Sequence, residues 1–547
     1  MNAPPAPSPF AIRLYRSLWT ANLVSSMGFM IQSVGASWLM TMLSPSPRMV
    51  ALVQTSTTLP ITLLALFAGA VADNLDRRRV MITAQSFMLA MSFFLAITAW
   101  LGMLNPALLL CFTFMIGCGT AMHNPAWQAS IGDIVPKPVL PAAVAYNSIA
   151  FNVARSAGPA IGGTIVAAAG AAIAFMINCI SYIGLIAVLV RWKPERSGHQ
   201  LPPERIGSAI ASGLRYVAMS PNLLRVAFRG VLFGASTSAV MALMPVVARD
   251  LLQGGAVTYG LLLCGFGIGA VGGALISARS RRRFSIDLVL AMASISIAIG
   301  ATIVALSSHI ALTMPALALC GGGWILGMSN LNVTVQLATP RWVVARAISL
   351  YQMSAFGGMA MGSWMFGTLA ARHSIPEALF VCAALQVAIV LIGLVIRLPR
   401  VDDLNMDLSQ QWSEPETEVP VEARSGPVAI TIHYQIDDED IPVFLAEMSE
   451  WRRLRRRDGA RRWTLYRDLA DPRIWIERYQ VPTWLDYMRH NTRRTHEDAE
   501  RFRRIHALHR GEGRPPVQRM IVVDPRSGGQ LVDREQDIPA SPIDEHH

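Results

Sequence analysis

Acidic residues are scarce in the first 400 of the 547 residues, where only eight of the 36 aspartates and glutamates lie. Hydrophobic residues make up 52% of the chain and charged residues only 15%, which is too apolar for an ordinary soluble domain. Most acids follow position 400, so two physically different parts share the chain. The eight early acids are Asp73, Asp76, Asp133, Glu195, Glu204, Asp250, Asp287 and Glu377.

Cysteine is also scarce, and two common site motifs are missing. The six cysteines all fall in apolar segments and none forms a C-x-x-C pair, so neither a disulfide framework nor a zinc site is indicated. The sequence has no G-x-x-x-x-G-K-[ST] loop, which is the phosphate-binding motif of ATP-driven pumps. We therefore expect no metal ion, no cofactor and no ATP hydrolysis.

Long apolar runs are what the sequence has in abundance. Crossing a bilayer takes about 20 apolar residues, and a helix lets such a run pair its own backbone polar groups. After a polar lead (1–12), twelve runs are long enough, so the sequence predicts an all-α membrane protein with twelve transmembrane helices. They cover approximately 14–43, 49–72, 80–103, 106–129, 139–168, 171–191, 222–248, 256–278, 284–306, 311–338, 347–371 and 376–397.

The basic residues between these runs gather in every second loop. Arg77 to Arg79 and Arg281 to Arg283 are the densest groups, whereas the alternate loops hold Arg48, Arg249 and Arg372 and few other basic residues. Basic loops remain on the cytoplasmic side of a membrane. The pattern therefore predicts a multi-pass protein with both termini in the cytoplasm.

Glycine, arginine and proline recur at a constant offset of 204 residues. This offset extends over nearly six spans, which indicates two repeated six-helix halves (13–191 and 222–400) joined by a cytoplasmic linker (192–221). Parallel repeats of this kind surround a central site in secondary transporters, where the two halves rock against each other. The matching pairs are Gly69 and Gly273, Arg77 and Arg281, Gly119 and Gly323, Pro136 and Pro340, and Gly158 and Gly362.

Three stretches resemble the major facilitator superfamily. "GAVADNLDRRR" (69–79) is similar to its G-x-x-x-D-x-x-x-R-R-R signature, and "GPAIGG" (158–163) resembles the G-P-x-x-G-G motif of its export antiporters. The longer segment from "NPAWQASIGD" to "GPAIGG" (124–163) is similar to the bacterial transmembrane secretion effectors, a branch that includes the enterobactin exporter.

This resemblance implies the major facilitator fold and secondary active efflux by alternating access. The expected cargo is a small organic molecule such as a siderophore, drug or metabolite, carried across the bacterial inner membrane in exchange for protons. The eight early acids all lie in loops or near span ends, so no deep carboxylate is available as the proton carrier. Asp73, Asp133 or His123 would have to share that task.

Two motifs are candidates for conformational control. A latch at the cytoplasmic end of the second span is expected from Gly69, Asp73, Arg77 and Arg78, because a carboxylate there can pair with arginine and accept bonds from a facing helix N-terminus. The arginines also fit a simpler role as anchors at the lipid surface. Gly158, Pro159, Gly162 and Gly163 are expected to form a hinge, with close helix packing as the alternative.

Arg155 is the most informative polar residue, because a charge midway along a span must face the protein interior or a wet cavity. It predicts an anion-recognising or coupling site, or else a structural partner for a neighbouring polar group. Other polar residues within the spans are expected to line the cavity or to bond helix to helix. With Arg155, the cavity and coupling candidates are Asn22, Gln32, His123, Asn124, Asp133, Asn152, Asn332 and Gln336.

The last 147 residues form the second part of the chain. An acidic linker (401–427) leads to a domain (428–524) whose pattern predicts strand, helix, two strands, one helix begun by a Thr483–Asp486 capping box, and a final strand. This order is that of an α+β ferredoxin-like domain. A disordered tail (525–547) is expected to follow.

This domain resembles the dimeric antibiotic-biosynthesis monooxygenases through "WIERYQVPTWLDYMRHNTRRTHEDA" (475–499). The resemblance implies a pocket formed by Trp463, Trp475, Tyr479 and His490, and dimerisation through this domain. A membrane-anchored enzyme or ligand sensor is therefore the alternative to a transporter. The same aromatic residues also fit an ordinary core. Nucleic acid is not an expected partner, because acids balance the arginines of 451–463.

Overall fold

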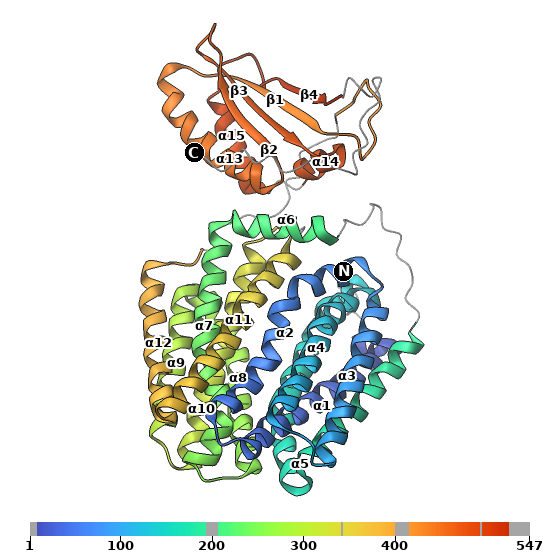
Figure 1. Ribbon diagram of the computed structural model, residues 1–547. Helices are drawn as coiled ribbons and strands as arrows, with labels where there is room; N and C mark the ends of the chain where they lie inside the picture. Colours follow the sequence, from blue (N-terminus) through green and yellow to red (C-terminus); the bar gives the residue numbers. More distant parts are fainter. Residues whose placement is uncertain (1–7, 193–205, 341–342, 400–414, 493–494, 524–547) are drawn as a thin grey trace, which may run out of the picture. The chain divides into compact units, whose positions relative to one another are not determined.

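The computed structural model describes residues 8–192, 206–340, 343–399, 415–492 and 495–523 (Figure 1). The chain forms two compact units. The first, which we call the helical unit, comprises Met1–Ala211, Asn222–Gln336 and Ala345–Arg400. The second, which we call the mixed unit, comprises Ser212–Pro221, Leu337–Val344 and Val401–His547. Residues 1–7 of the expected lead, 401–414 of the expected linker, residue 524 of the expected domain and the expected tail (525–547) lie outside the described residues.

The helical unit is a bundle of long helices that run up and down (Figure 1). Connections within each half are short, so successive helices are antiparallel neighbours. The first half contains α1 (Arg13–Leu43), α2 (Pro47–Asn74), α3 (Arg77–Trp100), α4 (Pro106–Ile134) and α5 (Leu140–Arg191). The second contains α7 (Pro221–Val246), α8 (Ala256–Arg283), α9 (Ile286–Leu306), α10 (Ile310–Leu337), α11 (Val344–Arg372) and α12 (Ile375–Val395). Between the halves, helix α6 (Ile206–Ala218) occupies part of the expected linker.

Helix α5 is two helices joined by a break. Gly170 has φ of 81°, a conformation that glycine adopts without steric cost. Ala143 near the start of α5 and Leu189 near its end belong to the same hydrophobic cluster around Tyr15. A straight 52-residue helix would be about 78 Å long, so the chain must fold back at Gly170.

Ten helices in the described part of the chain are long and apolar enough to cross a membrane. The folded-back α5 contributes one of these, Ala142–Arg191, although it is 50 residues long. Helix α11 is not among the ten, because its Gly, Ser, Trp and Tyr residues lower its mean hydropathy. The protein is therefore mostly helical with about ten apolar spans.

The internal repeat is visible in the packing. In the first half, Gly158 of α5 lies against Met30 of α1, where an added Cβ would approach the Met30 Cβ to 2.7 Å. In the second half, Gly362 of α11 lies against the carbonyl oxygen of Ala235 in α7. Met30 and Ala235 are themselves almost one repeat apart. Glycine therefore permits the same close helix approach at equivalent places in both halves.

The two ends of the bundle are packed differently. We call the end at which Arg13, Arg77 and Arg283 lie the basic end, and the other the far end. A continuous hydrophobic cluster at the far end combines residues of both halves, including Phe175 and Leu243. At the basic end, the cluster around Tyr15 contains only first-half residues. Within the part of the chain that the structure describes, the shared hydrophobic cluster therefore joins the halves at the far end.

The mixed unit contains a four-stranded antiparallel sheet of order β2-β3-β1-β4. The strands are β1 (Val428–Gln435), β2 (Arg461–Arg467), β3 (Ile474–Val481) and β4 (Val517–Ile521). Helices α13 (Ile441–Arg457), α14 (Trp484–Thr492) and α15 (His496–Ala507) complete the unit. Its core includes even-numbered residues of β1 and odd-numbered residues of β3, together with Phe444 and Trp451 of α13.

Two helices lie where the sequence pattern predicts one between β3 and β4. The expected Thr483–Asp486 cap is present, since the Asp486 amide donates to the Thr483 hydroxyl at 3.1 Å. A second capping box at Thr495 and Asp498 then begins α15. The single-helix prediction was wrong because each short segment has its own N-terminal cap, and a cap fixes where a helix begins.

Candidate functional site

A cavity of about 240 Å³ lies in the helical unit towards the basic end of the bundle. Helices α2 and α4 of the first half and α11 of the second half form its walls, and Ile210 of α6 also borders it. Polar side chains line one part of the cavity and apolar side chains such as Leu66, Pro125 and Ile348 line the rest. The polar lining residues are Asn124, Gln128, Arg346, Ser349 and Gln352.

Helical periodicity explains how these side chains reach one space. Asn124 and Gln128 are four residues apart on α4, and Ser349 and Gln352 are three apart on α11, so each pair shares a helix face. Gly69 of the signature motif faces Ser349, because a Cβ added there would lie 3.1 Å from the Ser349 hydroxyl oxygen. Amides and hydroxyls both donate and accept, whereas Arg346 only donates and is positively charged, so the cavity suits a polar ligand that offers acceptors and has an apolar part.

The signature arginine Arg77 joins three helix ends beside this cavity. Its Nη1 lies 2.8 Å from the Asp133 carboxylate and donates to the Ala129 carbonyl at 2.9 Å. Its Nε donates to the Ala72 carbonyl at 3.3 Å. Ala129 and Ala72 also line the cavity. Arg77 therefore fixes the ends of α2 and α4 that border it.

Arg78 caps the final turn of α5 rather than serving only as a lipid anchor. Its guanidinium donates to the carbonyls of Leu189 and Val190, at 2.8 and 2.7 Å. These carbonyls belong to a helix C-terminus, where a cation is favourable. Asp76 caps α3, accepting from the Arg78 amide at 3.0 Å. The side chain of Asp73, the central residue of the expected latch, lies outside the described part of the chain.

The second half has a smaller network at the equivalent position. Arg281 donates to the Ser277 hydroxyl at 2.8 Å, and the Asn330 side-chain amide donates to the same hydroxyl at 3.2 Å. Ser277 occupies the place of Asp73 in the repeat. The two halves therefore differ in charge at this point, although both retain the arginine four residues later.

Arg155 reaches from the first half to aromatic rings of the second. Its guanidinium carbon lies 3.7 Å from the centroid of the Trp324 ring in α10 and 5.9 Å from that of Phe266 in α8. The described carboxylates of the helical unit pair elsewhere, with Arg77, Arg79, Arg229, Arg249 and His373. Among the described side chains, the aromatic faces are therefore what balances this charge.

The glycines of the expected hinge pack α5 against two neighbours. Gly158 and Gly162 face α1, whereas Gly163 faces α8 of the other half. A Cβ on Gly163 would lie 2.8 Å from both the Ala256 carbonyl oxygen and the Gly260 Cα. The neighbouring Pro159 is buried within the helix. This arrangement shows close packing near the far end, and the hinge remains a prediction.

The other polar candidates whose side chains are described lie outside the cavity lining, apart from Asn124. Gln32 is buried and accepts from Ser92 and Asn178, both at 2.7 Å, so it bonds helix to helix. His123 is also buried, with Nδ1 at 3.3 Å from the Gln85 amide nitrogen. Gln336 donates to Asn332 on the same helix. Asn22 is half-buried in α1, and the Asn152 side chain is outside the described residues.

The structure brings three of the four candidates in the mixed unit around a buried ion pair. Arg455 and Glu477, 3.0 Å apart, are 2% and 0% exposed. Trp463 donates to Glu477 at 2.9 Å, the His490 Nε2 lies 2.8 Å from the Arg455 Nη1, and the Tyr479 ring lies 4.3 Å from the guanidinium. Trp475 instead packs against Phe444.

Tyr434 completes the set of groups around Glu477. Its hydroxyl donates to the Glu477 Oε2 at 3.0 Å. Burial, followed by the nearby Glu477 carboxylate, raises the pKa of Tyr434 well above its usual value, so the hydroxyl stays protonated and remains a donor. These contacts fill the space between the sheet and the helices with paired side chains.

The sequence analysis missed most of the polar cavity lining. The missed residues lie near span ends, where polar residues are common and therefore do not indicate a site. They are Gln128, Arg346, Ser349 and Gln352. Their spacing of three or four residues on α4 and α11 was the available signal. Trp324 and Phe266 were also missed as partners of Arg155, since no sequence pattern shows which helices of the two halves meet.

Comparison with known proteins identifies the helical architecture. The family model described as transmembrane secretion effector matches residues 5–527. The multidrug efflux pump Tap of Mycobacterium tuberculosis is 25% identical over 403 residues, covering 71% of this chain and 93% of Tap. The staphyloferrin A transporter of Staphylococcus aureus is 24% identical over 262 residues, covering 46% of this chain. The chain spans 64% of the length of that transporter.

Solved structures with the same fold are distant in sequence. A bacterial homologue of the human lysosomal transporter Spinster, in an inward-facing and unoccupied conformation, superposes with a TM-score of 0.54 at 12% identity. That match covers 70% of this chain and 95% of the homologue. The nucleoside transporter NupG gives a TM-score of 0.55 at 12% identity, covering 71% of this chain and all of NupG.

Proposed function

The chain belongs to the transmembrane secretion effector family of major facilitator transporters, and from this premise we propose that it exports a small organic molecule across the bacterial inner membrane. Relatives named as a multidrug efflux pump and a staphyloferrin A transporter support this proposal. Their cargoes suggest a drug-like compound, a siderophore or a related metabolite. Transport would be secondary and would proceed by alternating access.

The observation that carries the proposal is the cavity bordered by both halves towards the basic end of the bundle. At the far end, α5 and α8 approach backbone to backbone and one hydrophobic cluster joins the halves. A space between the two halves near one end, with the halves packed together at the other, is consistent with alternating access. If the basic end is cytoplasmic, this is an inward-facing arrangement.

Twelve crossings and cytoplasmic termini complete the proposed topology. The fold-back at Gly170 divides α5 into two segments, each about long enough to span the membrane. Counting α11 as well gives six helices in each half. The arginines at the basic end would then lie on the cytoplasmic side, which the distribution of positive charge favours.

Proton antiport is the proposed source of energy. Asp133 is accessible, with 43% of its side chain exposed, and it forms an ion pair with Arg77. Protonation of Asp133 would weaken this pair and loosen the ends of α2 and α4 beside the cavity. His123 is a second candidate, because no described group bonds its buried Nε2.

The mixed unit is proposed to be a ferredoxin-like, monooxygenase-like domain that does not carry the main activity. Its β-α-β-β-α-β order and antiparallel pairing support the assignment, with α14 and α15 in place of the second helix. Glu477 and Arg455 occupy the region where a substrate pocket was expected. This opposes catalysis in that region, and dimerisation or ligand sensing is the proposed role.

An accumulation screen tests the proposed function. Cells with and without the protein are compared for retention of a panel of drugs, siderophores and metabolites. We expect at least one compound to accumulate less when the protein is present. Gln128→Ala and Gln352→Ala in the cavity should abolish this difference, whereas Gln336→Ala, an exposed change outside the cavity lining, should not.

Two results oppose the proposal. If no compound in the panel differs, or if Gln336→Ala acts like the cavity variants, export through this cavity is not supported. Deleting residues 401–547 separates transport from the enzyme alternative. Efflux retained without these residues would show that the mixed unit is not the principal active part.

A further inference from the structure

Helix α6 begins in the helical unit and ends in the mixed unit. It is the connection between the two six-helix halves, since α5 precedes it and α7 follows it. Its residues up to Ala211 belong to the helical unit, and Ser212–Pro221 belong to the mixed unit. Part of the chain that links the two halves, residues 212–221, therefore belongs to the mixed unit.

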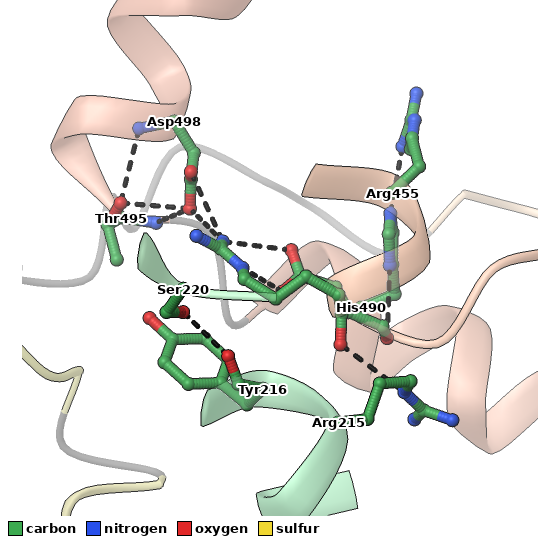
Figure 2. A network of polar contacts seen from close by, with 9 residues as sticks. Arg215, Tyr216, Ser220, Arg455, His490, Thr495 and Asp498 are labelled. Atoms are coloured by element: carbon green, nitrogen blue, oxygen red, sulfur yellow. Dashed lines mark hydrogen bonds and ion pairs between the residues drawn. The ribbon is translucent and has the colours of Figure 1, made fainter. Parts of the chain in front are cut away.

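The mixed unit holds this segment through Tyr216 and Arg215. The Arg457 guanidinium, at the end of α13, lies over the Tyr216 ring at 4.8 Å, and Tyr216 is only 2% exposed. The Arg215 Nε donates to the Arg457 carbonyl at 3.4 Å (Figure 2). Val217 is also buried, at 7% exposure.

Arg457 is fixed in place by two carboxylates. It bonds Asp458 at 2.8 Å and Asp498 at 3.0 Å, and only 11% of its side chain is exposed. Asp498 belongs to the Thr495 capping box that begins α15, as Figure 2 shows. The end of α13, with its C-cap residue Asp458, and the start of α15 therefore hold the side chain that receives Tyr216 in place.

The buried ion pair of the mixed unit is next to this contact. The Asp458 carbonyl lies 3.5 Å from the His490 Nδ1, and the other nitrogen of His490 is 2.8 Å from the Arg455 Nη1. Arg455 and Arg457 are two residues apart at the end of α13. A change in the Arg455–Glu477 pair therefore has a short path to the residues that hold Tyr216.

The other part of α6 borders the cavity. Ile210 is one of the cavity lining residues. It lies six residues from Tyr216 in the same helix, a separation of about 9 Å along the axis. Ile210 and Tyr216 are thus joined by fewer than two turns of one continuous helix, and this stretch is the path from Tyr216 to the cavity wall.

We propose that the mixed unit is a built-in control element that acts on the transport cavity by holding and releasing residues 212–221. This proposal rests on the proposed transport function. Holding α6 fixes the connection between the halves and restrains their rocking. When residues 212–221 are released, α6 can move, and so can the part of the cavity wall that Ile210 forms.

Hydrogen–deuterium exchange on the full chain in lipid nanodiscs tests this proposal without knowledge of the cargo. The variant Tyr216→Leu removes the aromatic face. We expect amide exchange in 212–218 to rise at least tenfold, and exchange in the cavity segments 66–72 and 346–352 to change at least threefold. Leu214→Ala, at an exposed position of α6, should change each of these by less than twofold.

Two outcomes would overturn the proposal. Either 212–218 exchanges as in the unmodified protein, or it loses protection while the cavity segments stay unchanged. If Tyr216→Leu also unfolds the sheet, seen as faster exchange in 428–435, the half-buried Arg215→Ala replaces it with the same criteria. Loss of transport is not the readout, so the failure of this proposal and that of the transport function are distinguishable.

Discussion

The Arg155 guanidinium in the first half lies 3.7 Å from the centre of the Trp324 ring in the second half. A permanent charge about midway along a span is expensive unless it faces protein groups or water. Trp324 provides a favourable π face for that charge and is 8% exposed. The contact joins α5 to α10, so it has to change if the halves move relative to each other.

We predict that Arg155→Ala and Trp324→Leu change transport in the same way. Each removes one side of a cation–π contact of about 1–2 kcal/mol, so a shift of roughly 5- to 30-fold in rate or in preference between cargoes is expected. Phe266→Leu should act more weakly, because Phe266 lies 5.9 Å from the guanidinium. Efflux assays with the compound found by accumulation screening measure these changes.

The double variant separates a functional contact from a structural one. If Arg155 and Trp324 act through each other, combining the two changes adds little to either alone. Independent, additive effects would contradict this, and a protein that fails to reach the membrane would favour a purely structural role for Arg155.

Asp73→Asn is expected to reduce transport at least tenfold while leaving membrane insertion normal. The reason is that a neutral amide cannot replace the carboxylate of the proposed latch next to Gly69 and Arg77. Efflux rate normalised to the amount of protein in the membrane is the measurement. Ser277→Ala, at the repeat-equivalent position, is the matched control and should have a smaller effect. Equal turnover in Asp73→Asn and the unmodified protein would refute the latch.

Gly163→Ala is expected to destabilise the helical unit by about 1–3 kcal/mol, the usual cost of overpacking. The new methyl group would lie 2.8 Å from the Gly260 Cα, where backbone atoms leave little room to adjust. Gly184→Ala in the same helix is the control, since a Cβ there meets nothing within 4 Å. Thermal unfolding in detergent should show a lower melting temperature for Gly163→Ala alone. Equal melting temperatures would disprove the close contact.

The mixed unit should lose stability near His509 as the pH falls. Burial lowers the pKa of His509 below its usual 6.5, so the fold favours the neutral imidazole. Its Nδ1 accepts a hydrogen bond from the Gln435 amide at 2.9 Å, which a protonated Nδ1 cannot do. The stabilisation is complete above about pH 6.5 and disappears as the pH falls through the lowered pKa.

Amide exchange of Gln435, corrected for the intrinsic effect of pH, measures this loss. We expect its protection to fall several-fold between pH 7 and pH 5, while that of Ile432 in the same strand stays constant. His509→Leu should remove the dependence on pH. Constant protection of Gln435 in the unmodified protein would contradict the prediction.

Much of the fold follows from local patterns in the sequence. Apolar runs of about 20 residues can satisfy their backbone only as helices in a membrane, so the helices of the bundle lie close to the expected ranges. The offset of 204 residues likewise indicated the repeat that Gly158 and Gly362 display. The strands of the mixed unit also lie where alternation places them. The break at Gly170 falls between the expected fifth and sixth spans.

The sites were less predictable, because they depend on contacts between distant segments. Sequence reasoning selected Asn124 and Arg155 but missed Gln128, Gln352 and Trp324, whose roles arise only when helices from both halves meet. The sequence also did not show that Arg78 caps α5. Nor did it show that Glu477 is bonded by Tyr434, Arg455 and Trp463.

The sequence by itself determined that this chain is a membrane-embedded, internally duplicated bundle with an α+β appendage, because hydropathy and periodicity are local properties. Tertiary structure alone decided which side chains share the cavity, where the charge of Arg155 is balanced, and that the connection between the halves is held by Arg457. These outcomes depend on which surfaces pack together, and packing is set by the shapes of whole helices and not by any short stretch of residues.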